Sequence, residues 1–411
     1  MSQQIHSHRF PCGLTLVAEE MNWLESAAFA LLLPGGVVRE TSSQGGLASL
    51  TTEMVQRGAG SRDSRQLVAD LENLGAETSA SVSIAHTSLG GAMPAESLMP
   101  VLSIYADIAR RPIIPADQLE DARNACLQEV RSVEDDLAQK SMQKLRMQHY
   151  GSPWGRSSQG TLESVASHSI DDVQNFYATN FKPEKGILTV AGKFDWEALK
   201  DQVANLFGDW GGESNAPDTQ VTGEMGYTHI QAESSQTHIA VAFEALPYSH
   251  QDYFQLRGAI GALSDGMSSR LFSEVREKRG LCYTVYASVH SLRDRGSVIA
   301  YSGTTAERAQ ETLDVLVAEL LRLHDGVEEI EIQQLKRRFK RSMIMQQESS
   351  TSRAGSIAYD WYHLARVRTI KELSQIVDSL SSETVNRYLA ASRPQRFTIV
   401  TVGPKPLTPP V

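Results

Sequence analysis

Three polar side chains share one face of a helix that the sequence predicts over residues 45–58. They stand at positions i, i+3 and i+4 and are Ser49, Thr52 and Glu53. A serine nucleophile needs a sharp turn around it and a histidine as base, but no G-x-S-x-G segment surrounds Ser49 and no histidine is close in sequence. None of the 11 histidines stands four positions from another histidine, so no histidine pair of the kind that binds zinc from one helix is present.

A second polar group lies where a predicted helix ends and a strand begins. The helix over residues 266–279 ends at Gly280, and the basic residues of its last turn suit the negative end of the helix dipole. In the strand that follows, strict alternation predicts that four residues share one face: Leu281, Tyr283, Val285 and Ala287. Taken singly, Arg276 is most simply interpreted as part of a solvated helix face. Tyr283 is most simply interpreted as a half-buried aromatic residue of the strand.

The elements that must position these residues repeat at about half the chain length. Residues 176–192 and 388–403 each consist of a helix end, a turn marked by proline, an apolar β run and a glycine. Residues 74–82 resemble residues 279–289, and the two pairs follow the same order along the chain. We therefore predict an α+β fold of two homologous halves, each a mostly antiparallel β-sheet with helices packed on one face.

The boundary between the halves is predicted from composition. Serine, glycine, asparagine, proline and aspartate crowd residues 211–223, which is typical of a linker. The predicted domains are accordingly residues 1–210 and 224–411.

Charge and cysteine content exclude several classes of protein. Asp plus Glu is 49 against 39 for Lys plus Arg, a net charge of −10, so no general attraction to nucleic acid or to an anionic membrane is expected. The three cysteines, Cys12, Cys126 and Cys282, are far apart and form neither a disulfide framework nor a CxxC zinc site. The first residues lack the features of a signal peptide, and the longest apolar run, 27–33, is too short to span a bilayer. We expect a soluble, cytoplasmic protein.

Residues 45–58 and 266–283 together resemble the pitrilysin/insulysin zinc metallopeptidases, and within them the mitochondrial-processing-peptidase-like branch. The second stretch, GMSSRLFSEVREKRGLCY, is the denser match, and the resemblance runs over nearly the whole chain. The family's first helix carries H-x-x-E-H, in which two histidines bind zinc and the glutamate is the general base. The resemblance implies that the two halves of this chain form one half of a clamshell peptidase chamber.

This sequence departs from the family motif at each critical position. Ser49 and Glu53 replace the two histidines, and Thr52 replaces the catalytic glutamate. The third zinc ligand of the family corresponds to Glu129, whereas a supporting carboxylate corresponds to Ala122. Two carboxylates and a hydroxyl without imidazole suit a hydrated hard ion better than zinc. We therefore expect no metal in this chain, no catalytic residue in the chain alone, and no hydrolysis by the isolated protein.

The second signature is retained. In the family, an arginine near the helix end and a tyrosine seven residues later project into the substrate chamber, and they correspond to Arg276 and Tyr283. The resemblance implies that they donate hydrogen bonds to a substrate carbonyl, and that the arginine also stabilises negative charge. Some bacterial members of the family are heterodimers in which one subunit carries zinc and the other carries the Arg/Tyr pair. This chain resembles the second kind, with zinc expected in a homologous partner subunit and peptides as substrates.

Two alternatives remain open at this point. One is a catalytically inactive scaffold, as in the core proteins of respiratory complexes. The other is a homodimer that binds peptides without hydrolysing them.

Overall fold

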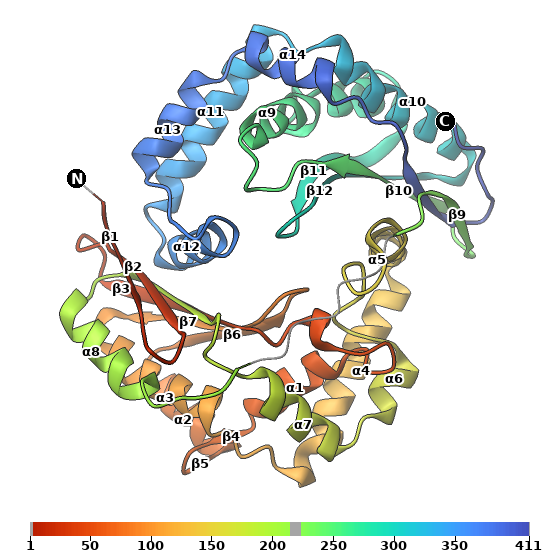
Figure 1. Cartoon of the computed structure of the whole chain (residues 1–411). Helices are drawn as coiled ribbons and strands as arrows, with labels where there is room; N and C mark the ends of the chain where they lie inside the picture. Colours follow the sequence, from red (N-terminus) through yellow and green to blue (C-terminus); the bar gives the residue numbers. More distant parts are fainter. Residues whose placement is uncertain (1–2, 214–222, 411) are drawn as a thin grey trace. The chain divides into compact units, whose positions relative to one another are not determined.

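The computed structural model describes residues 3–213 and 223–410, so most of the predicted linker, 214–222, lies outside the described residues. The chain forms two compact units. They comprise the described residues of Met1–Ser132, Arg156–Gln220 and Ile344–Arg368 in the first unit, and of Val133–Gly155, Val221–Met343 and Thr369–Val411 in the second. Each unit therefore takes one segment from the other half of the sequence, an exchange that the predicted boundaries do not contain (Figure 1). Every described helix is too short or too polar to cross a bilayer.

The first unit is built on a six-stranded sheet with the order β1-β2-β8-β3-β7-β6. Its strands are β1 Gln4–Arg9, β2 Thr15–Glu20, β3 Ser26–Leu33, β6 Glu77–Val82, β7 Thr87–Pro94 and β8 Ile187–Gly192. Neighbours are antiparallel except β2 and β8, which are parallel. A separate two-stranded ladder joins β4 Gly58–Ala59 to β5 Arg62–Asp63.

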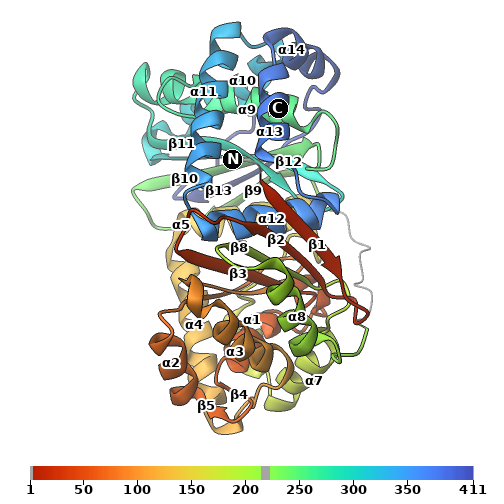
Figure 2. The same cartoon turned by 90° about the vertical axis from the view of Figure 1, so that its left-hand side faces the viewer.

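Helices from the first half of the chain cover one face of this sheet (Figure 2). They are α1 Leu47–Val55, α2 Ser64–Asn73, α3 Leu98–Arg110, α4 Leu119–Asp135, α6 Leu162–Ser167, α7 Ile170–Asn180 and α8 Trp196–Phe207, with 3-10 turns at Val37–Arg39, Ala95–Ser97 and Ala116–Gln118. Alternate strand residues such as Leu16 and Phe29 point into the core that these helices share with the sheet. Val17 and Ala28, which face the opposite way, pack against Ala354 of helix α12, Ser350–Leu364.

The second unit repeats this plan with a five-stranded sheet in the order β11-β12-β10-β13-β9. Its strands are β9 Gly226–Gln231, β10 Gln236–Ala245, β11 Cys282–Ser291, β12 Gly296–Thr305 and β13 Thr398–Gly403. The pair β9 and β13 is parallel, and the other neighbours are antiparallel. The mixed α+β architecture and the two homologous halves predicted from the sequence are confirmed.

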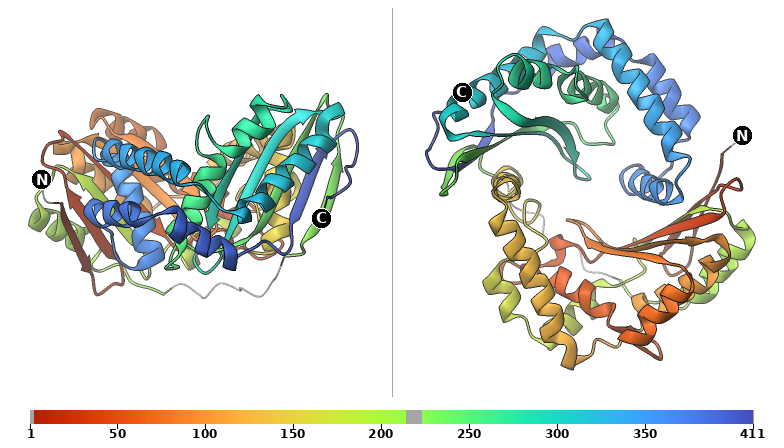
Figure 3. Two further views of the ribbon diagram at one scale, coloured as in Figure 1. Left: turned by 90° about the horizontal axis from the view of Figure 1, so that it is seen from above. Right: turned by 180° about the vertical axis from the view of Figure 1, so that it is seen from behind.

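One face of the second sheet also carries its own helices (Figure 3). They are α9 Tyr253–Ser264, α10 Ala309–Arg322, α11 Glu329–Gln346, α13 Ile370–Ser379 and α14 Ser382–Ala391, together with the π-helical turn η4 Phe272–Glu277 and 3-10 turns at Ala306–Arg308 and Leu323–Asp325. The opposite face packs against helix α5, Leu137–Tyr150, through Leu145. The prediction of helices on one face is therefore incomplete, since a single helix from the other half of the sequence covers the second face of each sheet.

Polar contacts fix both exchanged helices. On α12, Arg353 forms an ion pair with Glu19 of β2, and each side chain is only 1 % exposed. On α5, the His149 ring lies 2.9 Å from the Thr398 hydroxyl and 2.7 Å from the Ser297 hydroxyl. Buried polar groups with such partners hold a helix in one register, because any slip leaves them without hydrogen bonds.

Candidate functional site

Helix α1 carries Ser49, Thr52 and Glu53. A buried carboxyl group accepts a hydrogen bond from the first turn of this helix. Gly46 precedes the helix with φ of +84°, and a Cβ there would lie 2.7 Å from the carbonyl oxygen of Gln159, so only glycine fits. The Ala48 N–H donates to the Glu40 carboxyl group at 2.8 Å. Burial raises the pKa of Glu40 to about 8, although this N–H and its neighbours act in the opposite direction. Leu50 and Met54 are fully buried and fix the rotation of the helix against the core.

The polar groups of α1 are already used within the protein. The Ser49 hydroxyl donates to the carbonyl oxygen of Ser158 at 2.7 Å. The Thr52 hydroxyl donates to the carbonyl oxygen of Ala48 at 2.8 Å, and its side chain is buried. Glu53 accepts from Arg57 one helical turn later at 2.9 Å. Each of the three groups therefore has a hydrogen-bond or ion-pair partner within the protein.

Glu129 lies on α4 and is exposed. One turn earlier on the same helix, burial raises the pKa of the Cys126 thiol to about 12, and the charges of Glu129 and Glu53 add to this rise. Both carboxylates therefore lie close enough to the thiol for their charges to act on it. The structure brings Glu53 and Glu129 to the same region, as expected from the family pattern.

These donors do not fit a zinc ion. Within residues 3–213 and 223–410 no group of three or more His, Cys, Asp or Glu side chains is arranged to hold a metal. Ala122, at the position of the supporting carboxylate, is fully buried and offers no oxygen. A hydroxyl that donates to a carbonyl and a carboxylate paired with Arg57 lack both the softness and the free charge that zinc requires.

Arg276 and Tyr283 come together in the second unit. The guanidinium carbon of Arg276 lies 4.9 Å from the centroid of the Tyr283 ring and 4.8 Å from that of Phe272. Of the two acidic side chains on the turn, Glu274 accepts from Lys278 at 2.6 Å and from Arg279 at 2.8 Å. These hydrogen bonds hold the pKa of Glu274 at about 2. Glu274 is thus paired with two other cations, and no described residue forms a hydrogen bond or ion pair with the Arg276 guanidinium.

The orientation predicted for Tyr283 was wrong. In the pairing of β11 with β12, Cys282 lies opposite Thr304 and Thr284 lies opposite Gly303, so Tyr283 is an extra residue. A bulge of this kind redirects a side chain. Tyr283 is 81 % exposed, whereas Val285 packs against the core. Alternation therefore fails at the residue that the family resemblance selects.

Tyr283 lies on the edge strand of its sheet, where the Ala287 N–H donates to the Ser264 hydroxyl at 2.7 Å. Strand β11 ends its sheet, and Thr284, Tyr286 and Ser288 on it are exposed. An unpaired edge presents N–H and C=O groups to which an extended peptide can add as a further strand. Exposed donors beside an edge strand can bind the backbone of such a peptide.

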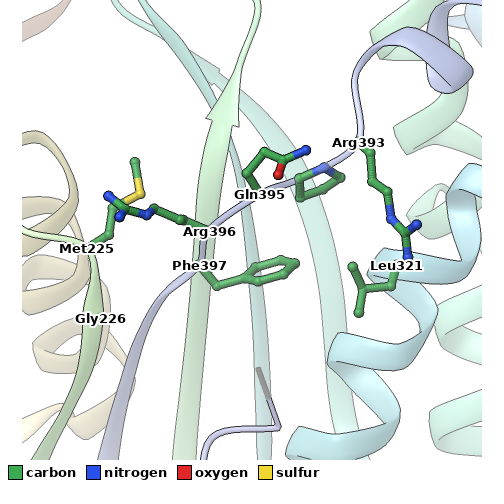
Figure 4. Close-up of a pocket in the computed structure, with 8 residues that line it drawn as sticks. Met225, Gly226, Leu321, Arg393, Gln395, Arg396 and Phe397 are labelled. Atoms are coloured by element: carbon green, nitrogen blue, oxygen red, sulfur yellow. The ribbon is translucent and has the colours of Figure 1, made fainter.

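Two cavities lie apart from the Arg276–Tyr283 contact. One of about 580 Å³ lies between α1 and α2 and includes Glu53 and Arg57 in its lining. The other, of about 560 Å³, lies in the second unit, where Arg393 and Arg396 stand at its two ends with the Phe397 ring between them (Figure 4). Neither lining includes Arg276 or Tyr283.

Sequence reasoning missed Phe272 and Glu40. Phe272 stands four positions before Arg276 on a predicted helix, and this spacing was a usable signal for contact between the two side chains. Glu40 stands eight positions before Ala48, beyond the spacing of any known capping motif, so no local pattern indicated it.

Two family models match most of the chain. Residues 16–160 match the family model described as Insulinase (Peptidase family M16), and residues 167–339 match that of the Peptidase M16 inactive domain. The uncharacterized zinc protease YmxG of Bacillus subtilis is 25 % identical over 96 % of this chain and 98 % of its own length.

Solved structures show the same fold. A crystal structure of a peptidase M16 inactive domain from Pseudomonas fluorescens superposes with a TM-score of 0.89 at 22 % identity, covering 99 % of this chain and all of that one. A chain of Complex III2 from Candida albicans superposes with a TM-score of 0.82 at 15 % identity, covering 97 % of this chain and 96 % of that one.

Proposed function

This chain belongs to peptidase family M16, and on that premise we propose that it is a substrate-binding subunit of a zinc peptidase and carries no zinc centre of its own. The observation that carries the proposal is the contact between Arg276 and Tyr283 beside the edge strand β11. The relatives named as zinc proteases supply the reaction class, hydrolysis of peptide bonds with zinc.

The state of α1 supports the absence of zinc chemistry in this subunit. Zinc peptidases need imidazole or carboxylate ligands with free lone pairs and a carboxylate base beside the metal. Here the corresponding groups are the hydroxyls of Ser49 and Thr52, both donating to main-chain carbonyls, and the ion-paired Glu53. The subunit contributes binding and orientation, and the zinc comes from its partner.

The Arg276 and Tyr283 side chains would act on the backbone of a bound peptide. The phenol offers one O–H donor and the guanidinium several N–H donors in one plane, which suits a carbonyl oxygen that gains negative charge. Strand β11 would hold the peptide in extended form by main-chain hydrogen bonds, which depend little on peptide sequence. Binding of this kind would select peptides by their conformation and length.

The partner we propose is a homologous M16 chain with an intact H-x-x-E-H helix, forming a heterodimer. A homodimer of this chain would have the same binding edge but no metal, and would bind peptides without cleaving them. The two assemblies differ in a single measurable property, chelator-sensitive hydrolysis.

One observation favours a second function. The likeness to a chain of Complex III2 from Candida albicans covers nearly the whole chain, so the fold is compatible with a scaffold role. A scaffold has no use for an arginine that forms no ion pair with any described residue and contacts an exposed tyrosine, and this feature favours the peptidase subunit.

Peptide hydrolysis by two samples tests the proposal. The chain is purified alone and, through an affinity tag, from its native source with its partners, and both samples are assayed with and without a zinc chelator. We expect chelator-sensitive cleavage in the native sample only. Cleavage by the isolated chain would contradict the loss of the zinc site, and no cleavage in either sample despite a stable partner would favour the scaffold.

A further inference from the structure

The Arg276 guanidinium contacts two aromatic rings, and only one of them belongs to the predicted site. Its carbon lies 4.8 Å from the Phe272 centroid and 4.9 Å from the Tyr283 centroid, both within the range of a cation–π contact. Among the residues that the structure describes, no hydrogen bond or ion pair of this guanidinium is found. The two rings are thus what defines its position.

The turn that carries both residues is π-helical. The Lys278 N–H donates to the carbonyl oxygen of Ser273 at 2.9 Å, five residues back, where an α-helix would use the residue four back. Such a turn holds one extra residue and rotates the residues after it around the helix axis. Phe272 and Arg276 lie on this turn, while Leu271 and Val275 are fully buried and anchor it.

We propose that Phe272 is a positioning residue for Arg276. Its ring covers a face of the guanidinium and holds the arginine beside Tyr283, so that the two donors reach one substrate carbonyl together. Stacking occupies the faces of the planar guanidinium and leaves the N–H groups at its edge free to donate. This inference rests on the proposed function for its consequence in catalysis, whereas the contact itself can be tested on the isolated chain.

The test on the isolated chain uses two substitutions of one residue. Phe272→Leu keeps an apolar side chain and removes the ring, and Phe272→Tyr keeps the ring. In the chain labelled with 15N at arginine Nε, the resonance of Arg276 is assigned as the signal lost in Arg276→Lys. We expect this signal to shift in Phe272→Leu, because the ring current is lost, and to stay near its place in Phe272→Tyr. An unshifted signal in Phe272→Leu overturns the contact.

The test on the native complex measures peptide hydrolysis. We expect Phe272→Leu to lower kcat/KM about 5- to 10-fold, Phe272→Tyr to restore it, and Phe272→Leu to have no further effect when Arg276→Ala is already present. The matched control is Phe339→Leu, another half-buried phenylalanine of the second unit, which should leave hydrolysis unchanged.

The outcomes separate the two proposals. Independent, multiplying losses from Phe272→Leu and Arg276→Ala overturn positioning while leaving the proposed function intact. Full activity in Arg276→Ala overturns the proposed role of the arginine, and the resonance of Arg276 then still decides whether Phe272 holds it. A loss in Phe272→Leu that Phe272→Tyr does not restore also overturns positioning.

Discussion

Apart from β1, which has no counterpart in the second sheet, the two sheets follow the same strand order, yet they differ where a helical turn leads into the edge strand. In the first unit α2 leads through Gly75 to β6, and in the second η4 leads through Gly280 to β11. Four positions separate the buried Leu71 from Gly75, whereas five separate the buried Val275 from Gly280. The second unit therefore contains one extra residue in the turn.

The edge strands differ in the same way. Pairing of β6 with β7 is regular from Glu77 to Val82, while pairing of β11 with β12 contains the bulge at Tyr283. A π-turn and a bulge each disturb regular hydrogen bonding and are frequent at functional sites. The regular unit shows what the fold requires, and the two irregularities of the second unit coincide with Arg276 and Tyr283.

The largest effect is expected at the irregular edge. Arg276→Ala or Tyr283→Phe should reduce turnover of the native complex ~10²-fold, by analogy with the loss of an oxyanion-hole donor, while the partner still copurifies. The matched change on the regular edge is Ser81→Ala on β6, for which we expect a change below about twofold. If Ser81→Ala reduced hydrolysis as much as Arg276→Ala or Tyr283→Phe, the distinction between the two units would be removed.

A second test moves metal chemistry into the first unit. Ser49→His, Thr52→Glu and Glu53→His together should create a zinc site with Glu129 as third ligand. After dialysis we expect about one zinc per chain in this variant, and less than about one tenth in the unmodified chain and in Glu53→His alone, measured by elemental analysis. A triple variant without zinc would contradict the alignment of residues 45–58 with the family motif.

The two units should also respond to opposite extremes of pH. The pKa of Glu40 is raised to about 8, so its contribution to stability is complete below about 4.5 and is lost as the pH rises through about 8. Burial lowers the pKa of His149 to about 4, so its contribution is complete above about 6.5 and is lost as the pH falls through about 4.

Glu40→Gln separates these two effects. It keeps an acceptor for the Ala48 N–H and removes the buried charge, so it should raise the free energy of unfolding by a few kcal/mol at pH 9. The loss of stability at acid pH should be unchanged. Denaturant unfolding at pH 5, 7 and 9 measures this. If Glu40→Gln lost as much stability between pH 7 and pH 9 as the unmodified chain, that loss would belong to another group.

The smallest effect concerns the extra residue of the turn. Deleting the exposed Glu277 should close η4 to a regular α-helical turn, raise Tm by a few degrees and reduce hydrolysis by the native complex. Deleting Glu72 from the regular helix α2 should instead lower Tm. Opposite signs in a thermal scan support the comparison, and the same sign for both deletions would break it.

The fold could be predicted from the sequence because its evidence is spread over many residues. The repeated segments 176–192 and 388–403 end in strands β8 and β13, which occupy the same place in their sheets. The exchange of α5 and α12 could not be predicted, since Leu145 and Ala354 lie on amphipathic helices whose pattern does not reveal which apolar face they cover.

The two residues of the candidate site were selected through the family resemblance, and their geometry could not be predicted from the sequence. The resemblance to the family's second signature identified Arg276 and Tyr283, and the structure places the two side chains in contact. The π-turn and the bulge each depend on a single extra residue, which changes no composition and no periodicity that a sequence window detects. Strict alternation therefore put Tyr283 on the same strand face as Val285 and Ala287, whereas the bulge leaves its side chain exposed.

The exchanged helices have a consequence for any attempt to divide the chain at residues 211–223. A fragment of residues 1–210 would retain α5 but lose α12, leaving Val17, Ala28 and the carboxylate of Glu19 without their cover. A fragment of residues 224–411 would retain α12 and lose α5, with the same result at the back of its own sheet. Neither piece is a self-sufficient folding unit, so two genes encoding them would have to be co-expressed to yield folded protein.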